Sequence, residues 1–131
     1  MIVLDSSALI AVSNDEPERQ KFQEIVAAAD RCLISSMTHF EVRMVTFGRF
    51  VAAGIERLTR WMAVFEPEIV PFDVHQADVA FAAFQIYGKG FHAKARLNFG
   101  DCASYALAKS RNVPLLFKGS DFAATDIVAA A

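Results

Sequence analysis

The chain has 131 residues, of which 54% are hydrophobic and 21% are charged. This length and composition argue against disorder and against several domains, so we expect a single domain over residues 1–131. Thirteen basic and fifteen acidic side chains give a net charge of −2. That balance excludes a polycation that binds nucleic acid over its whole surface, and any such partner must be held locally.

Nothing in the sequence predicts a membrane span or an export signal. Apolar runs such as 79–84 are far shorter than the roughly 18 residues that a span requires, and residues 1–5 lack a basic start and a cleavage site. Cys32 and Cys102 have neither zinc-type spacing nor a disulfide framework, so we interpret them as buried apolar residues. We expect a cytoplasmic protein without membrane contact.

The first part of the chain predicts strands that alternate with helices. An apolar, β-branched run over 2–5 is followed by serines, which is typical of a strand that leads into a helix. Pro17 follows a small acidic cluster and predicts the first turn of a helix that ends near Ala29. The run 32–35 predicts the second strand.

From Ser36 the pattern is helical. Apolar residues at spacings of four, three and four define one face, which we expect to be part of the core: Phe40, Met44, Phe47 and Val51. Gly54 is expected to separate this helix from a second one, which Pro67 closes.

The next predicted elements are an edge strand and a helix. The run 69–72 contains a proline, which suits an edge better than the centre of a sheet. Asp73, with Gln76 three residues later, resembles a capping box at the start of a helix that ends near Tyr87. The stretch 88–100 is basic and sparsely apolar, and we interpret it as a mobile surface loop.

The remaining pattern predicts a helix and two strands. The helix covers 101–111, a strand covers 113–117, a turn follows over 118–122, and a last short strand lies near 125–128. Because strands alternate with helices throughout, we expect an α/β domain: a central, mainly parallel sheet with helices on both faces.

Four acidic residues occupy comparable positions in this layout. Asp5 ends the first strand, Glu41 lies in the first turns after the second, Asp101 opens a helix, and Asp121 follows the strand 113–117. The carboxyl ends of parallel strands share one rim of the sheet, where ligands bind. These four side chains are therefore expected to meet in one cleft.

Clustered carboxylates repel one another, so such a group requires a compensating cation. Oxygen ligands without neighbouring Cys or His suit Mg²⁺ or Mn²⁺. Such a metal can polarise a phosphodiester and activate a bound water, which is nuclease chemistry.

Each acid also has a purely structural explanation. The helix dipole alone stabilises a carboxylate in a first turn by about 0.3–1 kcal/mol, which would account for Asp101 and Glu41, and Asp121 can simply shape a turn. Asp5 fits such an explanation least, because a charge at the end of an apolar strand must be paired or bound.

The chain resembles the PIN-domain ribonucleases and, among them, the VapC-like toxins of bacterial toxin–antitoxin pairs. The resemblance spans nearly the whole chain and rests on the order and spacing of four segments: 2–10, 34–41, 97–108 and 114–122. It implies a PIN-like domain and a metal-dependent endoribonuclease that acts on RNA such as tRNA or rRNA.

The resemblance also assigns residues and partners. Asp5, Glu41, Asp101 and Asp121 correspond to the acidic quartet that holds Mg²⁺ or Mn²⁺ in this family. The fourth position has an alternative, Asp126. Many relatives carry the motif Thr-x-Asp after this strand, whereas here Asp121 directly precedes Phe122. The family further implies a homodimer and a cognate antitoxin whose tail blocks the acidic cleft, often with a basic side chain.

Charge is unevenly distributed along the chain. Between residues 85 and 120 six basic residues stand against one acid, a local excess of five positive charges: Lys89, Lys94, Arg96, Lys109, Arg111 and Lys118 against Asp101. The basic loop can hold RNA phosphates through Lys89, Lys94 and Arg96, with Ser6 beside Asp5 as a further contact. Aromatic rings of the same region are available for base stacking: Phe91, His92 and Phe99. The simpler alternative is that these cations are only solvated.

Three further interpretations fit the sequence less well. His39 lies two residues before Glu41 and does not share its helix face, which argues against a general base. A receiver-type Mg²⁺-binding signalling domain has a similar length and a lysine comparable to Lys118, but it needs an aspartate after its middle strand, and no aspartate lies between Asp30 and Asp73. A nucleotide-binding module is disfavoured because neither glycine-rich phosphate motif occurs.

Overall fold

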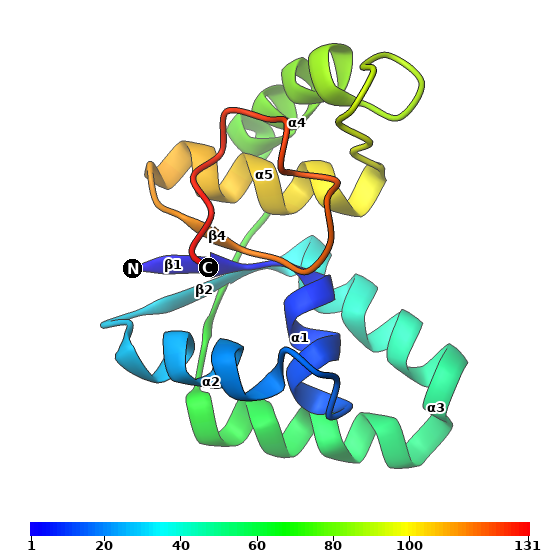
Figure 1. The fold of residues 1–131 in the computed structure, drawn as a ribbon, viewed down its shortest axis with the longest axis vertical. Coiled ribbons are helices and arrows are strands. Elements are labelled where there is room, and N and C mark those ends of the chain that lie inside the picture. Colours follow the sequence, from blue (N-terminus) through cyan, green and yellow to red (C-terminus); the bar gives the residue numbers. More distant parts are fainter.

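The computed structural model describes residues 1–131 and contains one four-stranded sheet with helices on both faces (Figure 1). The strands pair in the order β3-β2-β1-β4, and every pairing is parallel. The strands are β1 (Ile2–Leu4), β2 (Cys32–Ser35), β3 (Glu68–Val70) and β4 (Leu115–Leu116). This confirms the expected α/β class with a central parallel sheet, and β3 lies at an edge as its neighbouring proline predicted.

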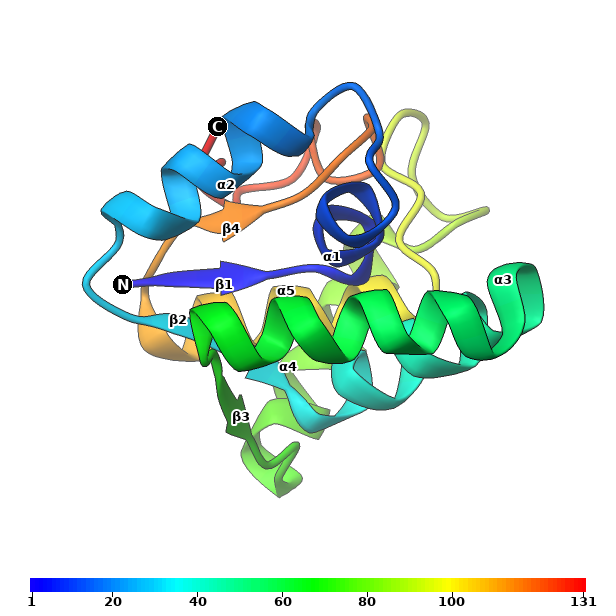
Figure 2. The ribbon, with the colours of Figure 1, turned by 90° about the horizontal axis from the view of Figure 1, so that it is seen from below.

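Five helices flank the sheet: α1 (Ser6–Ser13), α2 (Arg19–Ala28), α3 (Ser36–Phe65), α4 (Val74–Tyr87) and α5 (Phe99–Arg111). Helices α4 and α5 cover one face, while α1, α2 and the second half of α3 cover the other (Figures 1 and 2). Two apolar clusters follow this division, one around Leu9 and Ile34 and one around Leu33 and Leu107, so both faces of β2 are buried. None of the helices combines the length and apolar character needed to cross a bilayer.

The prediction that the apolar stripe of α3 belongs to the core is wrong. Its four apolar side chains are between 56% and 61% exposed: Phe40, Met44, Phe47 and Val51. The face that packs on the body of the protein instead carries Thr38, Val42 and Thr46, which are fully buried. Periodicity identified a face, but another face of the same helix meets the sheet, which leaves an apolar stripe in solvent.

The break in α3 also differs from expectation. The backbone leaves the helical region at Val51, with φ 48° and ψ −142°, three residues before Gly54. Gly54 lies beyond the kink, and a Cβ there would collide with Phe50. Gly54 thus leaves room for the Phe50 side chain after the bend and does not itself end the helix.

Two segments in the C-terminal half of the chain differ from the prediction. Residues 125–128 form no strand, and only an isolated parallel bridge joins Leu115 to Ala129. The stretch 88–100 is partly built into the body: Ala95 and Leu97 are fully buried, and the His92 ring accepts hydrogen bonds from the backbone of Lys94 and Ala95. This fixed turn directs the chain into α5.

Candidate active site

Asp5 lies at the point where β1 ends and α1 begins, with a side chain only 1% exposed. It caps α1: Oδ2 accepts hydrogen bonds from the backbone N–H of Ser7 at 3.1 Å and from its hydroxyl at 2.6 Å. Oδ1 accepts a hydrogen bond from the Ser104 hydroxyl of α5, also at 2.6 Å. A buried carboxylate is costly unless it is paired, and these donors hold it in one orientation.

Asp101 belongs to a capping box at the start of α5. Its backbone N–H donates to Oδ1 of Asn98 at 2.9 Å, and its Oδ2 accepts from the backbone N–H of Asn98 at 3.0 Å. Burial raises the pKa of Asp101 to about 7; the Asn98 hydrogen bond opposes this rise, and repulsion from Asp5, Asp121 and Glu41 adds to it. Since charge repulsion acts over short distances, these four acids are electrostatic neighbours.

Glu41 reaches the same place from the second turn of α3. Burial raises the pKa of Glu41, the Ser6 hydroxyl opposes the rise, and the charge of Asp5 adds to it. One oxygen, Oε1, is buried and has no hydrogen-bond partner. The carboxyl group lies so close to Gly100 that a Cβ on that residue would overlap it.

The two candidates for the fourth acid lie in different surroundings. Asp121 is exposed on the turn that follows β4, and its charge acts on Asp101. The carboxylate of Asp126 instead accepts hydrogen bonds from the Tyr105 hydroxyl and from the Lys109 ammonium, the latter at 2.6 Å. Asp126 therefore fastens the C-terminal segment to α5, whereas the charge of Asp121 acts on Asp101.

The donor set matches a hard divalent cation. All four groups are carboxylates, and one buried oxygen of Glu41 has no partner. Burial, and then the charges of its neighbours, raise the pKa of Asp101, which a bound cation would offset. In the structure no three Asp, Glu, His or Cys side chains already converge on a single point. A cation between the acids thus requires their side chains to turn inward, which the mutual repulsion of bare carboxylates opposes.

Basic residues of the turn before α5 lie beside Asp121. Lys94, Arg96 and Asp121 line an open cavity of about 640 Å³, with Ser120 and small alanines as the rest of its wall. Neither cation forms an ion pair. Lys89 is exposed in the same turn, and its backbone N–H donates a hydrogen bond to the backbone carbonyl of Leu97.

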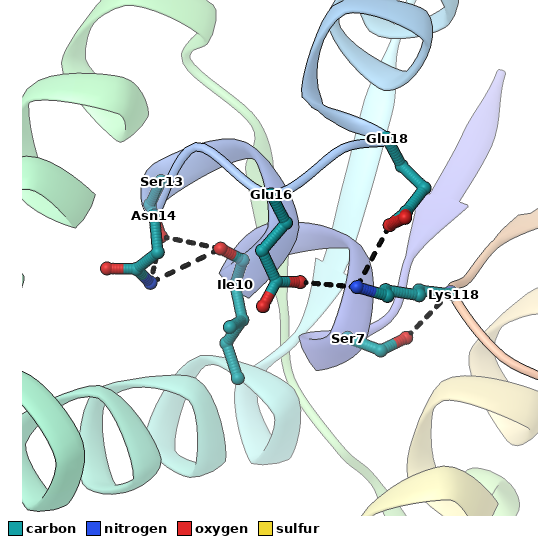
Figure 3. Close-up of polar contacts among 7 residues, drawn as sticks. All are labelled: Ser7, Ile10, Ser13, Asn14, Glu16, Glu18 and Lys118. Atoms are coloured by element: carbon teal, nitrogen blue, oxygen red, sulfur yellow. Dashed lines mark hydrogen bonds and ion pairs between the residues drawn. The ribbon is translucent and has the colours of Figure 1, made fainter.

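Other members of the predicted basic group have partners elsewhere. Lys109 pairs with Asp126, and Lys118 pairs with Glu16 and Glu18 at 3.0 Å each (Figure 3). The backbone N–H of Lys118 also donates to the Ser7 hydroxyl, the same hydroxyl that donates to Asp5. Lys118 thus ties the turn leading to Asp121 to helix α1 and to the loop after it.

This arrangement does not support a receiver-type domain. The lysine that such a domain needs at its acidic pocket is here neutralised by two glutamates on another loop. The strand order also differs, because β1 lies between β2 and β4 and not between β2 and β3.

Some residues of the site were missed from the sequence. Ser104 and Thr38 contact each other behind Asp5, and Gly100 makes room for Glu41. A signal was present: Ser104 follows Asp101 by three residues and Thr38 precedes Glu41 by three, so each shares a helix face with an acid. Burial and the charge of Arg43 lower the pKa of His39.

Comparison with known proteins places this chain in a family. The PIN domain model matches residues 2–128. The chain is 43% identical over 130 residues to Ribonuclease VapC30 of Mycobacterium tuberculosis, which covers 99% of this chain and 98% of the relative. It is 41% identical over 128 residues to Ribonuclease VapC of Mycolicibacterium smegmatis, with 98% of each covered.

Solved structures show the same fold at lower sequence identity. The M. tuberculosis VapC20 structure, described as a sarcin–ricin-loop-cleaving toxin, superposes with a TM-score of 0.79 at 14% identity and covers 98% of this chain and 97% of that one. A toxin–antitoxin complex from Klebsiella pneumoniae gives a TM-score of 0.72 at 21% identity, covering 100% and 98%. The chain belongs to the PIN-domain family and, within it, to the VapC ribonucleases.

Proposed function

We propose that the chain is a metal-dependent endoribonuclease, the toxin of a toxin–antitoxin pair, which hydrolyses phosphodiester bonds in RNA. The observation that supports the proposal is the electrostatic coupling of four acids from separate segments: the charges of Asp5, Asp121 and Glu41 all raise the pKa of Asp101, and that of Asp5 raises the pKa of Glu41. Relatives more than 40% identical over nearly the whole chain are named ribonucleases, which supports this chemistry. Residues 1–131 act as one domain, because both apolar cores rest on the same sheet.

The four acids have different roles in this proposal. Asp5 and Asp101 are the most buried and hold the metal, which is Mg²⁺ or Mn²⁺, with Glu41 and Asp121 completing the set. When bound, the cation supplies an activated water and stabilises charge on the phosphate. Once the Glu41 side chain turns toward the cation, its unpartnered Oε1 would accept a hydrogen bond from a water in the cleft.

RNA reaches the acids from the side of the basic turn. Lys94 and Arg96 lie in one cavity with Asp121 and bear charges that no acid neutralises, so they bind phosphates next to the bond that is cut. Lys89 extends this surface, and Ser6 contacts the substrate from beside Glu41. The substrate is a structured RNA such as tRNA or rRNA, which the protein meets in the cytoplasm.

Two apolar surfaces correspond to two protein partners. The α3 stripe (Phe40, Met44, Phe47 and Val51) begins directly beside Glu41 and binds a segment of a cognate antitoxin that continues into the acidic cleft. The second surface lies between α4 and α5, where only apolar residues, among them Phe72, Phe81 and Phe99, line a cavity of about 560 Å³. A second copy presents the same uncharged face, so this α4–α5 surface forms the homodimer.

The direct test is cleavage of a mixture of end-labelled tRNA and rRNA by the purified protein. Cleavage with Mg²⁺ or Mn²⁺, its loss with EDTA and its loss in Asp5→Asn are expected. Asp126→Asn is the matched control, because it removes an acid that is engaged by Tyr105 and Lys109, and it keeps cleavage. Absence of cleavage with every metal, or full cleavage by Asp5→Asn, contradicts the proposal.

A further inference from the structure

Two hydroxyl groups lie behind Asp5 in the interior of the protein. Ser104 Oγ is 2.6 Å from Asp5 Oδ1, and Thr38 Oγ1 is 3.0 Å from Ser104 Oγ. Ser104 and Thr38 are 0% exposed and Asp5 is 1% exposed. The three side chains come from α5, α3 and the end of β1, and they form one continuous chain of hydrogen bonds.

The direction of these hydrogen bonds follows from the chemistry of the groups. An ionised carboxylate only accepts, so the single hydroxyl hydrogen of Ser104 points to Asp5. Thr38 must then donate its hydrogen to Ser104. A serine that receives a hydrogen bond becomes a stronger donor, so Thr38 strengthens the contact that holds Asp5.

The positions of the two hydroxyls relate them to the other acids. Ser104 lies one helical turn after Asp101 on α5, and Thr38 lies one turn before Glu41 on α3. Their contact therefore joins the two helices one turn away from the carboxylates that those helices present. A change in this contact is therefore expected to alter both the separation of Glu41 and Asp101 and the orientation of Asp5.

We propose that Thr38 and Ser104 form a hydroxyl relay that positions Asp5 and sets the spacing of the α3 and α5 acids, and that it thereby determines the affinity of the site for a divalent cation. This inference rests on the proposed function, since it assumes that the acids bind a metal. Ser7 holds the other Asp5 oxygen through a local contact within the helix cap. Of the hydrogen bonds to the Asp5 carboxylate, only the one from Ser104 comes from a helix that carries another of the acids.

A purely structural role for the two hydroxyls makes a different prediction. If they only satisfy buried polar atoms, their removal lowers stability and leaves cation affinity unchanged. Thr46 provides a matched control, because it is also fully buried on α3 and its hydroxyl has no hydrogen-bond partner. Thr38→Val and Thr46→Val remove the same group from the same helix, and only the first interrupts the relay.

The experiment measures Mn²⁺ binding to the full-length protein by the EPR signal of free Mn²⁺, with RNA cleavage and thermal unfolding in EDTA recorded in parallel. Ser104→Ala is expected to weaken Mn²⁺ binding about 10- to 100-fold, the usual effect of losing a group that orients a metal ligand. Thr38→Val weakens it by a smaller factor, Thr38→Ser restores it, and Thr46→Val leaves it unchanged. At saturating Mn²⁺ the relay variants lower kcat and keep KM for RNA, because Lys94 and Arg96 bind the substrate.

The outcomes separate this inference from the proposed function. If Ser104→Ala and Thr38→Val bind Mn²⁺ as tightly as the wild type does, whatever their stability, the relay is wrong. The proposed ribonuclease function still stands in that case if the wild type cleaves RNA. If Ser104→Ala does not fold, the pair Thr38→Val and Thr38→Ser decides, since their side chains differ from threonine by little volume. A wild-type protein that neither binds Mn²⁺ nor cleaves RNA overturns both.

Discussion

Gly100 lies directly against the carboxyl group of Glu41, although the two residues come from different helices and are far apart in the sequence. The contact brings α3 to the first turn of α5, where free backbone N–H groups and the helix dipole favour negative charge. A residue without a Cβ is required there because any side chain would occupy the position of the carboxylate.

Gly100→Ala tests this close approach. The added methyl displaces Glu41, and a misplaced group at a reacting centre costs roughly 10- to 100-fold in cleavage rate. Gly48→Ala is the control, because a Cβ at Gly48 meets no atom within 4 Å. Equal cleavage by the two variants, measured at saturating metal, is incompatible with the proposed role of Glu41.

The pKa of Asp101, raised to about 7 mainly by burial, predicts how stability depends on pH in EDTA. In the unfolded chain this group titrates near 3.8, so the unfolded state loses its proton first as the pH rises. Stability therefore falls between about pH 4 and pH 7 and then levels off. Asp101→Asn, which stays neutral and keeps an oxygen to accept from Asn98, avoids that loss.

Denaturant unfolding of Asp101→Asn and the wild type at several pH values measures the effect. The variant is expected to match the wild type near about pH 4 and to exceed its free energy of unfolding by on the order of 2–4 kcal/mol near about pH 8. A variant that is less stable at the higher pH contradicts the electrostatic description of the cleft.

The kink in α3 predicts a stabilising substitution. Val51 has φ 48°, a conformation that costs a β-branched residue about 1–3 kcal/mol, and its side chain is 60% exposed, so little packing is lost on its removal. Val51→Gly is expected to raise the free energy of unfolding by about 1 kcal/mol. Ala52→Gly, at the exposed helical position next to it, is expected to lower it by about the same amount. Two changes of the same sign would show that the kink is not strained.

The two apolar surfaces predict separable losses of association. Phe47→Glu places a charge in the α3 stripe, and Phe81→Glu places one in the α4–α5 surface, where the side chains are 56% and 63% exposed. Phe47→Glu is expected to abolish the complex with the cognate antitoxin and to keep the dimer, while Phe81→Glu is expected to abolish the dimer. Light scattering after size exclusion, with and without the antitoxin, measures both, and loss of both associations in both variants contradicts the assignment.

Local patterns in the sequence predicted those features that depend on neighbouring residues. The second strand was predicted with its observed bounds, Cys32–Ser35, and Asp5 was expected where β1 ends. The caps at Asp73 and near Asp101 were also partly foreseen, because a cap is defined by residues within one turn.

Features that depend on distant contacts were not predictable in this way. Helical periodicity cannot say which side of α3 meets the sheet, so buried Thr38 was overlooked while exposed Phe47 was assigned to the core. The choice between Asp121 and Asp126 was open for the same reason. It depends on whether Tyr105 and Lys109, about twenty residues earlier, approach one of them.

The most direct test of the account is the anomalous signal of Mn²⁺ in crystals of the protein soaked with MnCl₂. We expect a peak bonded to carboxylate oxygens of Asp5 and Asp101, with Glu41 or Asp121 turned toward it and Asp126 still bound to Lys109. A peak at Asp126, or a fully occupied Mn²⁺ site that excludes Asp5 and Asp101, would contradict it.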